Sequence, residues 1–246
     1  MGRLFDIRVG VHVSWIAVYA FMTVTIARAF AEVPREVAYG LGAACALALF
    51  ASVVVHEFAH ALTARRYGLT TRAITLFLFG GVATLDEEPQ SPRAEVAIAL
   101  AGPIASAVLA AAAFAALVPL ERFGSGPLAA PLATLVAYLA AANGVLAAFN
   151  LIPAFPMDGG RVLRAVLWRR RKDRSSATVT AALAGVVFAA ALAGAGLFAV
   201  ARLHSWEFVW YGFVGVFLLR QGWVQYRDAA SVAGRANALK AAAASH

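Results

Sequence analysis

Six long apolar runs dominate the pattern of hydrophobic and polar positions along the chain. A helix that crosses the hydrocarbon core of a bilayer needs about 20 mainly apolar residues, which is close to the length of these runs. We therefore expect an α-helical integral membrane protein with about six transmembrane helices. The runs cover residues 13–31, 37–63, 94–118, 131–150, 178–201 and 207–226.

Two segments depart from this helical pattern. Residues 4–13 alternate apolar and polar side chains, with the period of a half-buried strand. Residues 70–86 are rich in Thr, Ile, Leu, Phe and Val around Gly80 and Gly81, a pair that favours a tight hairpin turn. Unpaired backbone groups cannot face lipid, so this hairpin should dip into the protein and pair with residues 4–13. The alternative is a membrane helix interrupted by glycines.

Composition and charge support the membrane assignment. The chain is 62% hydrophobic and 14% charged, with a mean hydropathy of +0.75, far from the values of soluble domains. The net charge of +8 could suggest a nucleic-acid-binding protein, but most of the 21 Lys and Arg residues fall on one side of the predicted spans. The other side holds Arg28, Arg35, Arg122 and Arg202. This asymmetry predicts both termini in the cytoplasm, a multi-pass protein of the cell (inner) membrane, and no nucleic-acid partner.

The first apolar run also raises the alternative of a cleavable signal peptide, because it ends in the small-residue sequence at 27–29. The strand-like alternation of residues 4–13 favours a retained N-terminus instead. We expect one membrane core over residues 1–226, followed by a cytoplasmic Ala-rich tail at 227–246 that frays. The only cysteine, Cys45, lies within a predicted span and is interpreted as a packing residue.

The sequence HEFAH at 56–60 places ionisable groups inside the second span. His56 and His60 are four residues apart, so on a helix both imidazoles project from one face and can bind one Zn²⁺. Glu57 lies beside them as a candidate general base. Charged groups at the centre of a membrane helix cost roughly 2.5 to 3.5 kcal/mol each, so a functional role explains them better than chance.

A second irregular segment follows the fourth span. Pro153 and Pro156 end or break the helix, and irregular backbone at membrane depth is tolerated where it lines a cavity. Asp158 comes directly after this break and can supply the third protein ligand that a catalytic zinc needs, with the fourth position open. The pattern predicts hydrolysis of a peptide bond by a zinc-activated water molecule, with Glu57 accepting its proton.

Two other functions remain open from the residues alone. A metal-ion transporter could use histidines and carboxylates as a transit site, but it needs neither a base beside the ligand nor a strand edge. A catalytically inactive homologue that binds membrane proteins would lack a reason to keep all four residues of the predicted zinc site.

The chain resembles the site-2 protease family of intramembrane zinc metalloproteases. HEFAH matches the HExxH signature of that family, and NLIPAFPMDGGRVLRA at 150–165 matches its second signature. FGG at 79–81, AGP at 101–103 and VGVHVSW at 9–15 are similar to weaker family elements. The resemblance covers nearly all of residues 3–226 and is closest to the six-helix bacterial and archaeal type. The accessory domains that other members carry are not visible in this sequence.

The resemblance implies that His56, His60 and Asp158 bind one zinc ion per chain and that Glu57 is the catalytic acid and base. It also implies that Asn143 and Asn150 matter near the site and that FGG at 79–81 belongs to a membrane-dipping loop. From its strand-like pattern, we expect the hairpin around Gly80 and Gly81 to align the unwound substrate. Asn143 and Asn150 are seven residues apart and share a helical face, where they would contact substrate or bond between helices. The implied partner is a membrane-anchored protein substrate, cleaved in or near its transmembrane segment by regulated intramembrane proteolysis.

Overall fold

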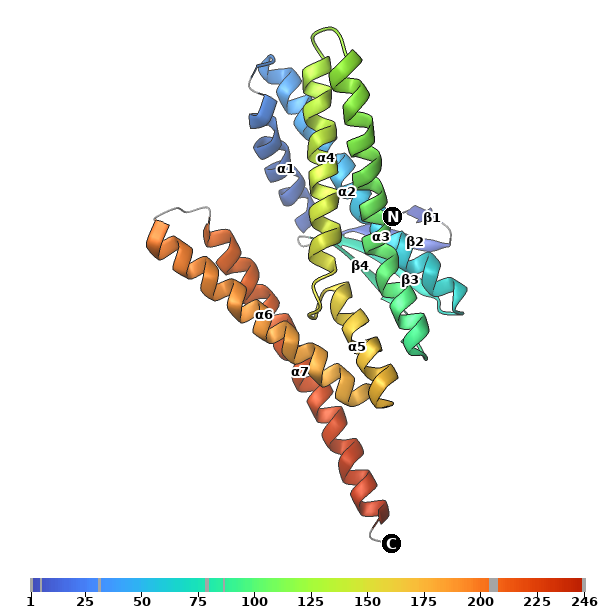
Figure 1. Cartoon of the computed structure of the whole chain (residues 1–246). Helices are drawn as coiled ribbons and strands as arrows, with labels where there is room; N and C mark the ends of the chain where they lie inside the picture. Colours follow the sequence, from blue (N-terminus) through green and yellow to red (C-terminus); the bar gives the residue numbers. More distant parts are fainter. Residues whose placement is uncertain are drawn as a thin grey trace. The chain divides into compact units, whose positions relative to one another are not determined.

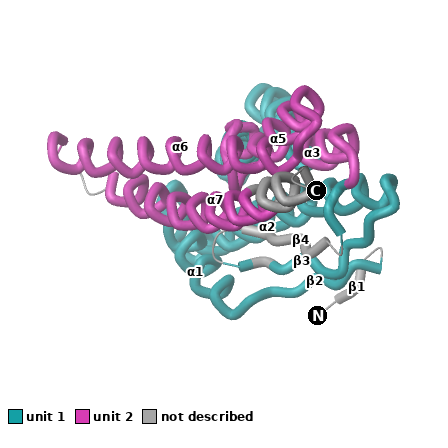
Figure 2. The backbone as a smooth tube through the Cα atoms, turned by 90° about the horizontal axis from the view of Figure 1, so that it is seen from below, with its two compact units in different colours: residues 1–89, 101–149 teal, residues 90–100, 150–246 magenta. Residues whose placement is uncertain are grey.

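The computed structural model describes residues 2–4, 6–30, 32–77, 80–85, 87–203 and 208–244. Residues 1–89 and 101–149 form one compact unit, and residues 90–100 and 150–246 form a second (Figure 2). The single membrane core over residues 1–226 stays a prediction. In chain order the elements are β1 (Gly2–Leu4), β2 (Ile7–Val11), α1 (Ser14–Ala27), η1 (Arg28–Phe30), α2 (Arg35–Arg66), β3 (Thr71–Phe77), β4 (Gly80–Leu85), α3 (Pro92–Phe123), α4 (Ala129–Asn150), α5 (Asp158–Arg171), α6 (Arg174–Leu203) and α7 (Val209–Ala244) (Figure 1).

The first unit contains a four-stranded sheet in the order β1-β2-β3-β4. β2 pairs in parallel with β3, with Val9 opposite Ile74, so the predicted pairing of the N-terminal segment with the hairpin is confirmed. The hairpin turn is not where the sequence placed it. Phe77 pairs with Gly80 and Leu76 pairs with Gly81, so both glycines lie in β4. Residues 78–79 between the two strands, which include Phe79 of the FGG sequence, lie outside the described residues.

The sheet packs on α2 through a small apolar cluster. Ile7 of β2 and Ile74 of β3 contact Phe58 and Ala61 of α2, and all four side chains are buried. Burial of apolar side chains is the main favourable term in such packing. The sheet therefore holds the part of α2 that carries the two histidines.

The other end of α2 packs against α1. Trp15 stacks on Tyr19 and meets the Phe50 ring at a centroid distance of 5.1 Å, while the Tyr19 hydroxyl donates to the carbonyl of Ala43. Cys45 is fully buried in the cluster formed by this contact, which agrees with its interpretation as a packing residue.

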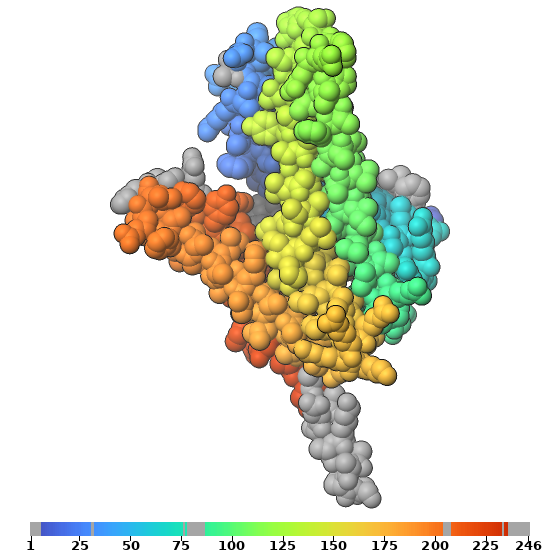
Figure 3. Space-filling view, viewed as in Figure 1, coloured from blue at the N-terminus to red at the C-terminus, as the bar shows by residue number. Residues whose placement is uncertain are grey.

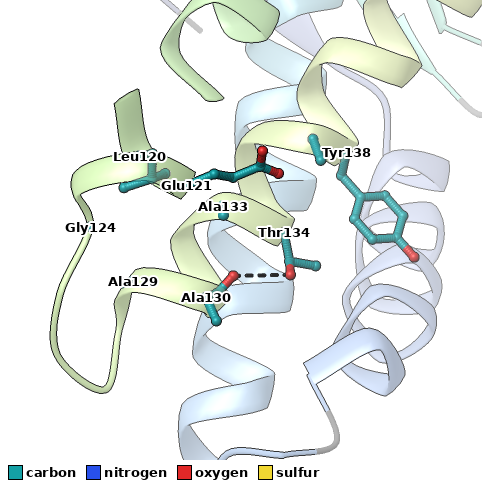
Figure 4. A pocket seen from close by; sticks show the side chains of 9 residues that line it. Leu120, Glu121, Gly124, Ala129, Ala130, Ala133, Thr134 and Tyr138 are labelled. Atoms are coloured by element: carbon teal, nitrogen blue, oxygen red, sulfur yellow. Dashed lines mark hydrogen bonds between the residues drawn. The ribbon is translucent and has the colours of Figure 1, made fainter. Parts of the chain in front are cut away.

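Residues 101–123 of α3 run beside α4 in the first unit, as both the ribbon and the space-filling view show (Figure 1, Figure 3). A pocket lies where α3 ends and α4 begins (Figure 4). Glu121 is the one acidic residue among those that line it, and Thr134 bonds within its own helix to the carbonyl of Ala130. None of the predicted site residues lines this pocket.

Four helices in the described part of the chain are long and apolar enough to cross a membrane: α2, α3, α4 and α6. They correspond to four of the six predicted spans. The segment Ser14–Phe30 is a shorter apolar helix, and α7 is not among the four, so the predicted number of six is not confirmed. The sequence did not predict α5, which follows the proline-containing segment and carries Arg169, Arg170 and Arg171 in its last turn.

In the second unit, α6 and α7 pack along each other, and α5 packs on α6. The buried positions of α6 are alanines and glycines, including Ala181, Ala182 and Gly185, and small side chains let helix backbones approach closely in membranes. α7 continues to Ala244, where the sequence predicted a frayed tail from residue 227. Alanine has the highest helix propensity, which accounts for the difference.

Candidate metal centre

The candidate metal centre contains the two histidines of α2. The Nε2 atoms of His56 and His60 lie 3.1 Å apart, and the side chains are only 3% and 9% exposed. The rings meet edge to face with centroids 4.8 Å apart. Two nitrogens bound to one tetrahedral zinc at about 2.0 to 2.1 Å would be about 3.3 Å apart. The observed spacing therefore fits two nitrogen ligands of one zinc ion.

Ser106 of α3 orients the first of these rings. Its hydroxyl lies 2.9 Å from Nδ1 of His56, and Ser106 is completely buried. A hydrogen bond at one ring nitrogen fixes the rotation of the imidazole and its tautomer, which directs the other nitrogen to the metal. Ser106 was not among the residues predicted from the sequence. The only hydroxyl side chain in the predicted span 94–118 was the signal that could have found it.

Gly102 leaves open the space beside the same two nitrogens. A β-carbon at this position would collide with Nε2 of His60 and would lie 2.5 Å from Nε2 of His56. Real β-carbons essentially never come so close to another heavy atom. Gly102 and Ser106 are four residues apart and face α2 from the same side of α3. In the sequence, Gly102 is only part of the weak family element AGP, and the structure gives the physical reason for the glycine.

Glu57 follows His56 on α2, and its side chain is half-buried. A carboxylate in this position can exchange a proton with a water molecule near the two histidines, as a general base does. The structure therefore places three of the four predicted zinc-site residues on one helix of the first unit.

Asp158 belongs to the second unit, where it is the first residue of α5 and half-buried. The two glycines after it allow the first turn of α5 to fold onto the preceding segment. A β-carbon on Gly160 would lie 2.5 Å from the backbone nitrogen of Phe155. A carboxylate is favoured in the first turn of a helix by the helix dipole.

An ion pair fixes the same part of the second unit. Arg164 of α5 donates from Nε to Oε1 of Glu95 at 2.6 Å and makes a second contact with that oxygen from its terminal nitrogen. Glu95 is 1% exposed, and the Arg164 guanidinium also lies 5.3 Å from the centre of the Phe155 ring. Arg164 is one of the many Lys and Arg residues on the predicted cytoplasmic side, and neither it nor Glu95 was singled out from the sequence. A glutamate inside a predicted span was the available signal.

The two asparagines of α4 have different surroundings. Asn143 is 3% exposed, and its amide nitrogen donates to the Ser52 hydroxyl at 3.1 Å and to the Leu139 carbonyl at 2.9 Å. These bonds agree with the interhelical role that the sequence left open for this residue. Asn150 is the last residue of α4 and is half-buried.

Comparisons with known proteins agree on one family. The model described as Peptidase family M50 matches residues 44–126 and 119–194. A Mycobacterium tuberculosis protein provisionally named zinc metalloprotease Rip3 is 38% identical over 222 residues, which cover 89% of this chain and 56% of that protein. A Synechocystis protein provisionally named zinc metalloprotease sll0528 is 34% identical over 236 residues, which cover 93% of this chain and 60% of that protein.

A solved structure gives the same result. The site-2 protease from Methanocaldococcus jannaschii is similar with a TM-score of 0.60 and 27% identity, over 92% of this chain and 94% of that chain. The chain spans less than two thirds of the length of the mycobacterial and cyanobacterial relatives.

Proposed function

Since the chain belongs to peptidase family M50, we propose that it is an intramembrane zinc metalloprotease that hydrolyses a peptide bond in or near the transmembrane segment of a membrane-anchored protein. The observation that carries this proposal is the pair of buried imidazole nitrogens 3.1 Å apart on α2. The space that Gly102 leaves beside them supports it.

One zinc ion per chain would be held by His56, His60 and Asp158. Two imidazole nitrogens and one carboxylate oxygen are a donor set that zinc accepts, and three protein ligands leave the fourth position open for catalysis. Ser106 would hold His56 in the orientation required for binding.

Glu57 would move the protons of the reaction. When bound, zinc supplies Lewis acidity that activates water and polarises a carbonyl group at neutral pH. The Glu57 carboxylate accepts a proton from the attacking water while the water oxygen bonds to the carbonyl carbon of the substrate. Glu57 then donates that proton to the departing amide nitrogen as the C–N bond breaks, which yields a carboxylic acid and an amine.

The sheet would present the substrate in an extended form. A transmembrane helix has no free backbone groups, so a segment must unwind before its carbonyl can be attacked. β3 has a neighbouring strand on each side, so β4, the second strand of the hairpin, is an edge strand of the sheet. Gly80 and Gly81 lie in β4, and β4 contacts α2. We propose that the substrate adds to β4 as a further strand, with Asn143 and Asn150 contacting it nearby.

The enzyme would lie in the cell (inner) membrane with both termini in the cytoplasm. The four apolar helices and the one-sided distribution of Lys and Arg support this orientation. Cys45 is the only cysteine and is buried, so introduced cysteines report cleanly on topology. In intact cells a membrane-impermeant maleimide should label Ser125→Cys and leave Arg170→Cys unlabelled. The reverse pattern would overturn the orientation.

A cleavage assay with purified protein tests the activity. The full chain is loaded with zinc and incubated with a transmembrane substrate, and products are identified by mass spectrometry. Glu57→Gln should retain zinc and lose cleavage, whereas Glu36→Gln, at an exposed position in the first turn of the same helix, should match the unaltered protein. Wild-type turnover by Glu57→Gln would overturn the proposed role. Absence of cleavage by the unaltered protein over a range of transmembrane substrates would favour an inactive binding protein instead.

A further inference from the structure

A small apolar pocket lies in the first unit, one helical turn from His56. Its volume is about 180 Å³, and α1, α2 and α4 all contribute to its walls. Its lining has six apolar residues and two polar ones, Ser52 and Asn143. The apolar residues are Met22, Leu49, Phe50, Val53, Ala142 and Leu146. Apart from Ser52 and Asn143, these side chains are apolar and offer an occupant no hydrogen bond.

The orientation of the Asn143 amide is fixed by its neighbours. The Ser52 hydroxyl donates its proton to the carbonyl of Ala48, so its oxygen accepts from Asn143. The carbonyl of Leu139 is also an acceptor. Both contacts therefore require the amide nitrogen of Asn143, and the amide oxygen Oδ1 is directed elsewhere.

Oδ1 of Asn143 is buried and has no hydrogen-bond partner among the described residues. A buried acceptor without a partner costs about 1 to 3 kcal/mol, so a partner that is absent from the free chain would relieve the cost. An occupant that satisfies the pocket must combine an apolar group with an N–H or O–H donor. A lipid acyl chain has no donor. An unwound peptide has both, because its backbone N–H groups have lost their helical partners.

We propose that this pocket is a specificity subsite that receives one apolar side chain of the unwound substrate, while Oδ1 of Asn143 accepts the backbone N–H of that segment. This inference rests on the proposed proteolytic function. Ser52 precedes His56 by four residues, which is about 6 Å along a helix. Two residues of extended chain cover about the same distance, so the side chain would belong to a residue about two positions from the scissile bond.

The side chain of Ala142 allows a direct test of the pocket. Ala142→Phe fills it, whereas Ala141→Phe adds the same group at the neighbouring exposed position of α4 as a matched control. Leu146→Ala enlarges the pocket. Once the scissile bond is mapped, Ala, Leu and Phe are placed in turn at each position within two residues of it, and kcat/KM is measured for every combination.

At one position we expect the unaltered protein to prefer Leu over Ala by roughly ten-fold, as burial of a large apolar side chain predicts. Ala142→Phe should abolish or reverse that preference, Leu146→Ala should move it toward Phe, and Ala141→Phe should leave it unchanged. A preference that moves in opposite directions in two variants cannot come from misfolding. Identical preferences in all four proteins at every position would overturn the proposal and leave lipid or water as the occupant.

The hydrogen bond is tested in the substrate rather than in the protein. Replacing the amide N–H with an ester oxygen at the responsive position should lower kcat/KM roughly ten-fold in the unaltered protein. The same replacement should have little effect in Asn143→Leu, because the acceptor is already absent. A full loss in both proteins would remove Asn143 from the subsite.

A binding assay tests the subsite independently of proteolysis. The Kd of a fluorescent transmembrane peptide for the Glu57→Gln protein is measured with Leu or Ala at each central position. Ala142→Phe in that background should weaken binding of a Leu peptide and spare an Ala peptide. That result without any cleavage would refute the protease and retain the subsite, whereas cleavage with no dependence on Ala142 would do the opposite.

Discussion

The hydroxyl of Ser106 lies 2.9 Å from Nδ1 of His56, and both residues are buried. Their contact joins the helix that carries the HEFAH sequence to α3, and it turns the Nε2 atom of His56 toward His60. A hydrogen bond of this kind at one ring nitrogen is the usual support of a histidine that binds a metal through the other.

Removing this hydroxyl should weaken zinc binding without removing a ligand. We expect Ser106→Ala to lower zinc affinity roughly 10- to 100-fold, because the imidazole of His56 is no longer held in one orientation. Competition with a chromophoric chelator measures the change. Ser125→Ala, in the exposed loop between α3 and α4, is the matched control and should bind zinc like the unaltered protein. Equal affinities for all three proteins would contradict the role.

Adding a single methyl group at Gly102 should have a larger effect. The β-carbon of Gly102→Ala would occupy the space beside Nε2 of both histidines, so we expect zinc to be lost together with cleavage. Gly40→Ala on α2 is the control, because a β-carbon there meets nothing within 4 Å and favours the helix. Zinc content by mass spectrometry decides the outcome. Full zinc occupancy in Gly102→Ala would show that the metal is bound elsewhere.

The assignment of Asp158 as the third zinc ligand predicts that its replacement lowers zinc binding. Asp158→Ala should lower zinc occupancy after dialysis, because two imidazoles alone bind zinc less tightly than two imidazoles and a carboxylate. Asp173→Ala, at an exposed position beyond the end of α5, is the control. A stoichiometric zinc content in Asp158→Ala would exclude the residue from the ligand set.

The buried ion pair of the second unit gives a prediction on stability. Arg164→Met leaves the Glu95 carboxylate buried without its partner, which should cost about 3 to 5 kcal/mol and lower the thermal unfolding midpoint in detergent. The double variant Glu95→Gln with Arg164→Met removes the charge and should recover most of the loss. A double variant as unstable as Arg164→Met would mean that Arg164 acts through its contact with Phe155 rather than through the ion pair.

Proline substitution tests the addition of a substrate strand to β4. Proline removes a backbone donor, so its effect depends on whether the altered amide faces β3 or the free edge. A single proline at Val82, Ala83 or Thr84 should impair cleavage and spare zinc binding at the positions whose N–H faces outward. Zinc content and a melting curve distinguish these from variants that unfold the sheet. Intact cleavage in every correctly folded proline variant would leave substrate positioning to the helices.

The pairing of the two histidines in the candidate metal site was predictable from sequence because its determinants are local. The spacing of His56 and His60 puts both rings on one face of any helix, and the structure places their Nε2 atoms 3.1 Å apart. Ser106 and Gly102 were not predictable in the same way. Their importance depends on which turn of α3 packs against α2, and hydrophobicity alone does not determine that register.

Similar reasoning explains the outcome for the fold. Long apolar runs predicted α2, α3, α4 and α6 to within a few residues, because length and hydropathy are sufficient for a membrane helix. The hairpin was predicted with its turn misplaced. Gly80 and Gly81 suggested a turn by their conformational freedom, but pairing with Leu76 and Phe77 placed them in β4. The basic helix α5 was missed because its pattern is short and follows a proline-rich segment.

The parallel pairing of β2 with β3 also sets an order of assembly during synthesis. A hairpin can close as soon as its two strands emerge, whereas parallel strands need a long crossover, and here α1 and α2 supply it. β2 is therefore synthesised before both helices, and its partner strand β3 follows them in the chain. The pairing of β2 with β3 closes a chain segment that contains the HEFAH helix, so the sheet can be completed only after that helix has been synthesised.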